Sequence, residues 1–265
     1  MGTTPRLTPH DAQSRRGAGI QGPGRTVGVV TVHTFHLART SLLTTAKAFV
    51  RPPSSTSVPG LHYAECMSTM QLGAPVLSPK RLQLTRLAIF AAWESEDAID
   101  DFLASPGLGN DLADGWHVRM EFLRRWGHIA EFDGLPISTG ETDPELPVVA
   151  VTLARLKHTQ LLRFIKWGKP VEELVRDDPG TTISLAAMHP FNTVSTFSVW
   201  KSQREMTDMV RGHSENPDPE RHAAAMRERS RKDFHFEFTT LRFRALSEHG
   251  TWDGRSNIVP TEPAV

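Results

Sequence analysis

An internal repeat constrains the fold of this chain more than any other feature of its sequence. Two copies, each about half of the chain, share four short motifs in the same order. The aligned motifs are Val29-Val30 with Val148-Val149, Pro59-Gly60 with Pro179-Gly180, the F-x-x-W-x-S run ending at Ser95 with that ending at Ser202, and Leu123-Arg124 with Leu241-Arg242. Each copy predicts the element order β-α-β-β-α-β, which is the ferredoxin-like arrangement.

A ferredoxin-like unit packs its helices on one face of an antiparallel sheet and leaves the other face to be covered. Two units in one chain can cover each other. We therefore predict an α+β fold in which tandem ferredoxin-like repeats form a pseudo-dimeric α/β barrel with the helices outside. A ligand cavity is expected between sheet and helix or inside the barrel.

The distribution of Pro, Gly and polar residues predicts the boundaries of the two repeats. Residues 1–25 hold almost no large apolar side chain, which predicts a disordered N-terminal tail. Residues 26–133 form the first repeat and residues 147–255 the second. The polar, Pro- and Gly-containing segment 134–146 is expected to link them, and residues 256–265 to form a short C-terminal tail.

Charge and cysteine content exclude several classes of protein. The 30 basic and 30 acidic residues balance, which argues against nucleic acid as a partner. The single cysteine, Cys66, excludes an intramolecular disulfide and a multi-cysteine metal site, and fits a reducing cytoplasm. No stretch approaches the ~20 apolar residues of a membrane span.

Common catalytic motifs are absent from the sequence. The glycines of residues 17–24 follow no predicted strand, so they are no dinucleotide fingerprint. There is no G-x-S-x-G or H-E-x-x-H motif. Cys66 is better explained as a buried core thiol than as a nucleophile.

Histidines remain as candidate site residues. His222, Ala225 and Met226 recur at helical spacing, which places the imidazole on an apolar helix face. It could be a core histidine there or a ligand. His117 and His235 start the fourth strand of each repeat, which favours a structural role. For His33 and His36, and for His62 on the second strand, a cavity position is open but a surface position is favoured.

Tryptophans and arginines allow two interpretations each. Trp93 and Trp200 are expected to be core anchors rather than stacking platforms for a ligand. The row of arginines near the ends of the fourth strands could receive an anionic group such as a propionate, but a solvated strand face is favoured. This row consists of Arg124, Arg125, Arg242 and Arg244.

The sequence resembles the spheroidene monooxygenase family of bacterial carotenoid ketolases. The resemblance extends over most of residues 27–255 and is most specific in the last sixty or so. It is carried by the leading VVTV strand, the F-x-x-W-x-S corner at residues 197–202, the helix HAAAMRERSRKDF beginning at His222, the strand end LRFRAL and the segment GTWDGR at residues 250–255.

The resemblance implies a haem-dependent monooxygenase that oxidises an apolar small molecule such as a carotenoid. His222 is then the axial ligand of haem b, and Met226, Phe236, Phe238 and Arg242 are the other expected cofactor-binding residues. Dioxygen or peroxide, an electron donor and a second copy of the chain are the implied partners. No catalytic residue is identified.

Two other functions stay open at this point. One is a different haem enzyme of specialised metabolism on the same fold, such as a dehydratase, a peroxidase or an N-oxidising enzyme. The other is a cofactor-free module that binds a hydrophobic ligand.

Overall fold

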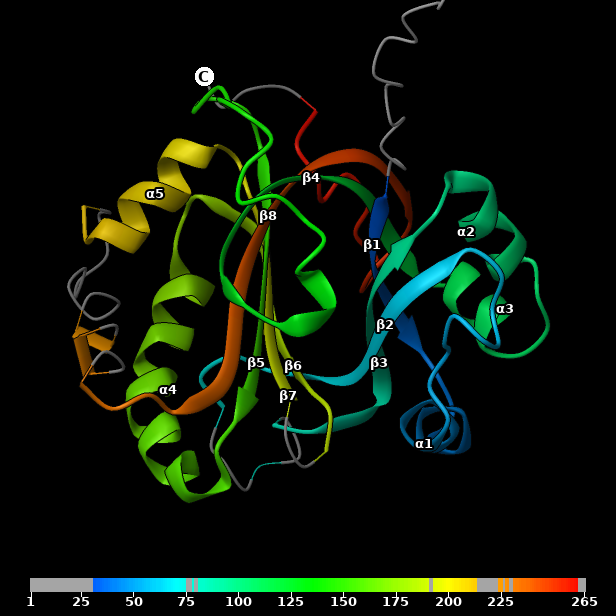
Figure 1. Ribbon diagram of the computed structural model, residues 1–265, viewed down its shortest axis with the longest axis horizontal. Helices are drawn as coiled ribbons and strands as arrows, with labels where there is room; N and C mark the ends of the chain where they lie inside the picture. The colour runs from blue at the N-terminus through cyan, green and yellow to red at the C-terminus, as the bar shows by residue number, and fades with distance from the viewer. Residues whose placement is uncertain are drawn as a thin grey trace, which may run out of the picture.

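Eight antiparallel strands close into a barrel in the computed structural model of the chain (Figure 1). The structure describes residues 31–74, 78, 81–190, 193–213, 224–225, 227–228 and 231–261. The strand order is β1-β3-β2-β6-β7-β5-β8-β4. It contains the ferredoxin-like order twice, so the predicted tandem-repeat barrel is confirmed. The segment expected to form a disordered tail, residues 1–25, lies outside the described residues.

The first repeat supplies four strands and three helices. Its elements are β1 (Val32–Arg39), α1 (Leu42–Val50), β2 (Leu61–Met70), β3 (Gln83–Trp93), α2 (Glu96–Leu103), α3 (Leu108–Ala113) and β4 (Trp116–His128), followed by the short turn η1 (Ala130–Phe132). The first helix begins at Leu42, where Ser41 caps it by accepting a hydrogen bond from the Thr44 amide.

The second repeat has the same order. Its elements are β5 (Val148–Leu156), the turn η2 (His158–Gln160), α4 (Leu161–Asp177), β6 (Thr181–Met188), β7 (Thr193–Trp200), α5 (Gln203–Arg211) and β8 (His235–Gly250). Ser202 caps α5, as Ser95 caps α2, by accepting a hydrogen bond from the amide three residues on. The repeated F-x-x-W-x-S motif is therefore the corner where a strand ends and a capped helix begins.

Strand pairing corrects the alignment of the two repeats in their first and fourth strands. Val32 pairs with Trp93 in the first repeat, and Val148 pairs with Trp200 in the second. Val32 is thus equivalent to Val148, three residues away from the sequence alignment. The fourth strands shift as well, since the partner of Thr34 is Arg119 and the partner of the equivalent Ala150 is Arg242. Matching His117 with His235 was wrong for the same reason.

The barrel axis is filled by large apolar side chains. Phe35 and Phe197 stack with ring centroids 3.9 Å apart, one from each repeat. Phe90 and Phe243 join the same buried cluster, and none of these four rings is exposed to solvent. Burial of this many aromatic carbons is the main driving force that holds the two repeats together.

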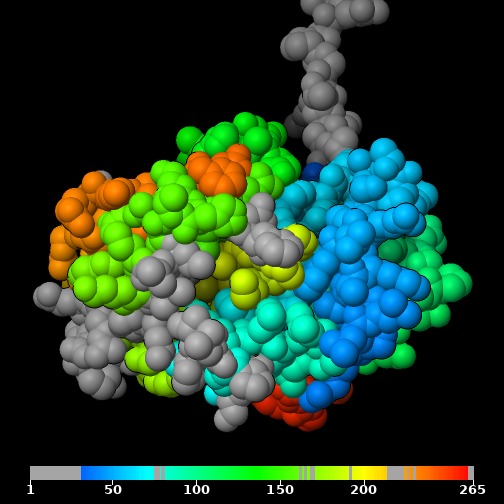
Figure 2. Space-filling view, turned by 90° about the horizontal axis from the view of Figure 1, so that it is seen from below, coloured from blue at the N-terminus to red at the C-terminus, as the bar shows by residue number. Residues whose placement is uncertain are grey.

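The helices of the two repeats lie on opposite sides of the barrel (Figure 1). In the space-filling view the blue and cyan part of the first repeat and the bright green to orange second repeat occupy different halves of the visible face (Figure 2). Trp93 and Trp200, each 1% exposed, anchor the corners beneath α2 and α5, as predicted. Their indole N–H groups donate to Thr34 and Ser198.

The two seams between the repeats differ in length. Strands β4 and β8 pair through twelve residue pairs, whereas β2 and β6 pair only through Ser68–Met188, Thr69–Ala187 and Met70–Ala186. The repeats are therefore joined by a long strand pairing on one side of the barrel and by a short one on the other.

The segment expected to be a C-terminal tail packs against the barrel over its described part. Ile258 is 1% exposed, and the amides of Ile258 and Val259 donate to the carboxylate of Glu248. The same carboxylate accepts a hydrogen bond from the Trp116 indole. Within the described residues, no helix is long and apolar enough to cross a membrane.

Candidate functional site

The outer faces of the two four-stranded units are covered to different extents. In the first repeat Thr34, His36, His117 and Arg119 are all buried beneath the helices, each at most 6% exposed. Strand pairing makes them equivalent to Ala150, Thr152, Thr240 and Arg242 of the second repeat. All four of these are only half-buried. The outer face of β5 and β8 is thus less completely covered than the outer face of β1 and β4.

The lining of this half-buried face is small and mildly polar. Thr152 and Thr240 hydrogen-bond to each other at 3.2 Å, where the first repeat has the two imidazoles of His36 and His117. Replacing two rings by two hydroxyl groups leaves the face flatter. We call the set Ala150, Thr152, Phe238 and Thr240 the outer strip.

Two of the predicted cofactor-binding residues lie along the outer face of β8, one in the outer strip and one at its end. Phe238 is half-buried, and it lies four residues before Arg242 on the same face of β8. Phe236 is different: it has no partner on β5, because Arg155 pairs with Glu237 and Leu156 with His235. The resulting bulge leaves Phe236 56% exposed.

The other two predicted residues, His222 and Met226, lie outside the described residues. Their described neighbour Ala225 is helical and 4% exposed. The nearby Glu228 carboxylate accepts a hydrogen bond from Arg163 in the first turn of α4 at 2.7 Å. This part of the predicted helix therefore lies against the second repeat, beside α4 (Figure 1).

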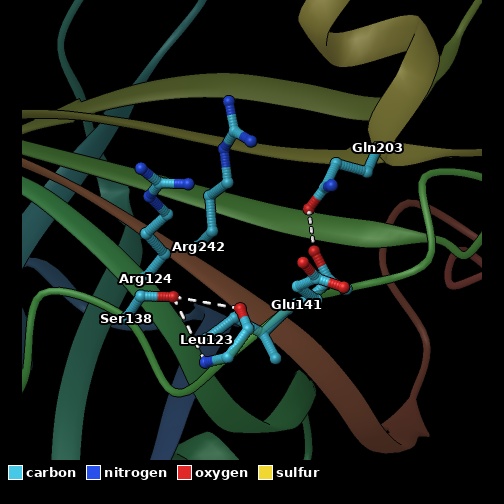
Figure 3. A pocket seen from close by; sticks show the side chains of 8 residues that line it. Leu123, Arg124, Ser138, Glu141, Gln203 and Arg242 are labelled. Atoms are coloured by element: carbon cyan, nitrogen blue, oxygen red, sulfur yellow. Dashed lines mark hydrogen bonds between the residues drawn. The ribbon is translucent and has the colours of Figure 1, made fainter.

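A pocket of about 300 Å³ lies next to the outer strip, between β4, β8 and the start of α5. Arg124 and Arg242 stand side by side along one wall, and Gln203 and Glu141 face them from the other (Figure 3). Leu123, Ser138, Gly140 and Thr142 complete the lining. Arg242 is thus brought to a pocket, while Arg125 donates to the backbone of Leu135 and Arg244 pairs with Glu121.

Both guanidinium groups of the pocket form cation–π contacts with the indole ring of Trp126. The guanidinium carbon of Arg242 lies 4.3 Å from the ring centroid and that of Arg124 lies 4.6 Å from it. Burial, together with the positive charges of Arg124 and Arg211, lowers the pKa of Arg242 to about 10. Arg242 still carries its charge at neutral pH, in a location where positive charges accumulate.

One wall of the pocket is formed by the segment between the repeats, which the sequence did not predict. Residues 138–142 were expected to be a linker, but Thr139 donates its amide to Leu123 and Arg125 donates its amide to Ile137. The segment therefore runs along β4 and closes one side of the pocket. Its alternation of polar residues gave no signal that could have distinguished it from a linker.

A second group of polar side chains faces the interior at one end of the barrel. The Tyr63 hydroxyl donates to Glu65 at 2.9 Å, and Arg155 pairs with Glu131 and Glu237. Burial raises the pKa of Glu65, although the hydrogen bond from Tyr63 acts against it. Burial likewise raises the pKa of Tyr63. This pair can hold a proton in a nearly water-free environment.

The positions of His33, His36 and Cys66 can be compared with those expected from the sequence. His33 and His36 are buried, at 1% and 0% exposure, so the favoured surface position was wrong for both. His33 points into the barrel, 4.9 Å from the ring of Phe243, because β1 is covered on both faces. Cys66 is buried and burial raises the pKa of its thiol, as expected for a core residue. Within the described residues, no group of three or more His, Cys, Asp or Glu side chains is arranged to hold a metal ion.

Fold and site together define a single-chain barrel of two ferredoxin-like units, with a basic pocket beside an incompletely covered sheet face. No family model matches the chain. Spheroidene monooxygenase of Rubrivivax gelatinosus is 28% identical over 200 residues, which cover 74% of this chain and 73% of the relative. The enzyme of the same name from Rhodobacter capsulatus is 30% identical over 135 residues, covering 50% of this chain and 52% of that protein. The chain is a distant relative of the spheroidene monooxygenases, as its motifs predicted.

Solved structures with a related chain path are remote in sequence. An anthrone oxidase-like protein is 12% identical with a TM-score of 0.31, and the match covers 86% of this chain and 96% of that one. A ferredoxin fold protein of Listeria monocytogenes, described as related to antibiotic biosynthesis monooxygenases, is 10% identical with a TM-score of 0.27, over 83% and 99% of the two chains. The fold assignment rests on the strand order of the barrel itself.

Proposed function

We propose that the protein is a haem-dependent monooxygenase that inserts oxygen into an apolar small molecule of the carotenoid type. The observation that carries the proposal is the 28% identity to a spheroidene monooxygenase over three quarters of the chain. The half-buried outer strip supports it, because an equivalent face in the first repeat is fully covered by protein.

The residues present around the outer strip suit haem b. Phe238 offers an aromatic face, and Thr152 and Thr240 form a flat surface against which a planar ring can lie. Arg242 supplies positive charge at the edge of the strip. His222 would hold the haem iron, and Met226, four residues later in the sequence, would be one of the cofactor-binding residues. When bound, haem iron supplies the activation of dioxygen or peroxide for oxygen transfer.

The protein's own contribution is to orient the ring and to exclude water. A neutral imidazole is required for the ligand role, and its other ring nitrogen needs an acceptor that fixes the tautomer. An apolar substrate would enter from the uncovered side of the strip, where Phe238 provides contact area. An electron donor must deliver two electrons for each oxygen atom inserted if dioxygen is the oxidant.

An absorption spectrum tests the haem proposal directly. Full-length protein produced with a haem precursor should show a Soret band, which the His222→Ala substitution removes or shifts. His62→Ala, at an exposed position on β2, is the matched control and should leave the band unchanged. A band that His222→Ala leaves unaltered would move the ligand to another residue.

A protein that remains colourless after haem is added would contradict haem dependence. In that case a cofactor-free module for hydrophobic ligands becomes the better explanation. If haem binds, incubation with a reductant, dioxygen and an acyclic carotenoid should give a product heavier by one oxygen atom in mass spectrometry. Dehydration or peroxide consumption without oxygen insertion would favour a different haem enzyme on this fold.

A further inference from the structure

Arg119 and Arg242 occupy the same position in the two repeats. Arg119 pairs with Thr34 across β4 and β1, and Arg242 pairs with the equivalent Ala150 across β8 and β5. Both side chains point to the outer face of their sheet, toward the helix that follows the tryptophan corner. The two arginines therefore occupy equivalent positions but differ in their partners.

In the first repeat the arginine is neutralised by carboxylates of α2. Arg119 donates to Glu96 at 3.0 Å and forms a second ion pair with Asp100. Burial alone would lower the pKa of Arg119, but the hydrogen bonds to Asp100 and Glu96 raise it. Its side chain is 7% exposed, so this charge is satisfied within the protein.

In the second repeat both carboxylates are missing. Counting from the capping residues Ser95 and Ser202, Glu96 corresponds to Gln203 and Asp100 to Thr207. Thr207 donates its hydroxyl to the backbone of its own helix. Arg242 therefore forms no ion pair with a described residue, and Arg124 stands beside it on the same Trp126 ring without one either.

The pocket contains one acidic side chain, Glu141, which lies across from the arginines beside Gln203 (Figure 3). With Arg124 and Arg242 both charged, the lining keeps a net positive charge. Two adjacent guanidinium groups without counter-charges repel each other, and an external anion would remove this cost.

We propose that this pocket binds the carboxylate group of a small organic molecule, with Arg242 and Arg124 as its ligands. The first repeat shows which anion the position accepts, because Arg119 holds carboxylates there. A planar guanidinium matches a carboxylate through two parallel hydrogen bonds. The hydroxyls of Ser138 and Thr142 lie in the same lining and can add further hydrogen bonds. The inference holds with or without haem.

Calorimetric titration of haem-free, full-length protein tests the pocket. The probes are octanoate and methyl octanoate, which share their apolar chain and differ in charge. Octanoate should bind at least about tenfold more tightly than its ester, because a hydrogen bond to a charged group is worth roughly that factor or more. Equal binding of the two probes, or binding of neither, would overturn the proposal.

Three substitutions sharpen the test. Arg242→Gln should weaken octanoate binding about 10- to 100-fold. Arg244→Gln is the matched control, since Arg244 lies two residues further along the same strand, is exposed and pairs with Glu121. Gln203→Glu restores the carboxylate that the first repeat has at this position. It should weaken octanoate binding as Arg242→Gln does, while keeping the arginine and the fold.

Haem and its dimethyl ester distinguish two sources of the carboxylate. If a haem propionate occupies the pocket, haem should displace octanoate while the dimethyl ester should not. If both displace octanoate equally or neither does, the carboxylate belongs to another molecule, and the pocket stands. Octanoate binding by a protein that never takes up haem would support the pocket and contradict the proposed cofactor. Haem binding with no preference for octanoate over its ester would support the cofactor and contradict the proposed pocket.

Discussion

His36 and His117 stack face to face across β1 and β4, with ring centroids 4.9 Å apart. His249 of β8 continues the row, 4.6 Å from His117. The row passes from the fully buried His36 to the exposed His249 on the outer face of the first repeat. Arg119 and Asp100 are the charged groups beside it.

This row predicts a loss of stability at acid pH. Burial lowers the pKa of His117 to about 4, helped by His249 and Arg119, and lowers that of His36 as well. Because the folded pKa is below the unfolded value of about 6.5, the unfolded chain takes up protons first as the pH falls. Each such histidine should reduce the free energy of unfolding by up to about 1.4 kcal/mol per pH unit between about pH 6.5 and 4.

Urea unfolding at several pH values between 7.5 and 4.5 measures this slope. His117→Asn should make the slope shallower, whereas His128→Asn, at an exposed position, should leave it unchanged. Identical slopes in all three proteins would show that His117 is not responsible.

The two equivalent arginines should differ in their effect on stability. Arg119→Gln removes a buried charge that two carboxylates satisfy, and we expect a loss of about 1–3 kcal/mol in the free energy of unfolding. The lower end is expected, because Glu96 and Asp100 are more than half exposed and regain water. Arg242→Gln should change stability by less than about 0.5 kcal/mol. Chemical denaturation of both variants measures the difference, and equal losses would contradict it.

The stacked pair at the barrel axis should be the most sensitive position in the core. Phe197→Ala removes a ring with no exposed surface that lies against Phe35, so about 3–5 kcal/mol should be lost. Phe236→Ala, a change of the same size at the exposed bulge, should cost less than about 0.5 kcal/mol. Thermal or urea unfolding distinguishes the two, and a large cost at Phe236 would place that ring in an interface.

Glu65 gives a prediction of the opposite sign to that of the histidines. Its pKa is raised by burial, so the folded state prefers the protonated carboxyl and loses stability as the pH rises above the unfolded value. Glu65→Gln imitates the protonated form and keeps an acceptor for the Tyr63 hydroxyl. It should therefore stabilise the protein at pH 8 and have little effect at pH 4. A loss of stability at pH 8 would mean that Glu65 is charged and needed as such.

The corners of the repeat could be predicted from sequence, whereas the register of its strands could not. The F-x-x-W-x-S motif specifies a local structure, since the tryptophan fills the core and the serine caps the next helix within three residues. Strand register depends on partners far away in the chain. Val148 can be aligned with Val29 or with Val32, because β1 is buried on both faces and its burial shows no alternation that would fix the register.

The candidate site was predictable only in part for a related reason. Arg242 and Phe238 stand out by residue type, and their shared face of β8 follows from strand alternation. Arg242 is a candidate ligand because the carboxylate that neutralises its equivalent in the first repeat is missing. That absence is visible only when Gln203 is compared with Glu96 in a correct structural alignment. The wall contributed by residues 138–142 arises from backbone pairing with β4, which polar residues of a loop do not encode.

The short pairing of β2 with β6 is the seam at which the barrel can open most easily. Releasing three residue pairs would unroll the molecule into one curved sheet of eight strands, with both repeats intact and still joined along β4 and β8. Amide hydrogens of Ser68, Thr69 and Met70 should then exchange with solvent well before those of β4. A chain that opens in this way exposes two free strand edges at once, and a second molecule opened at the same place could close against both of them.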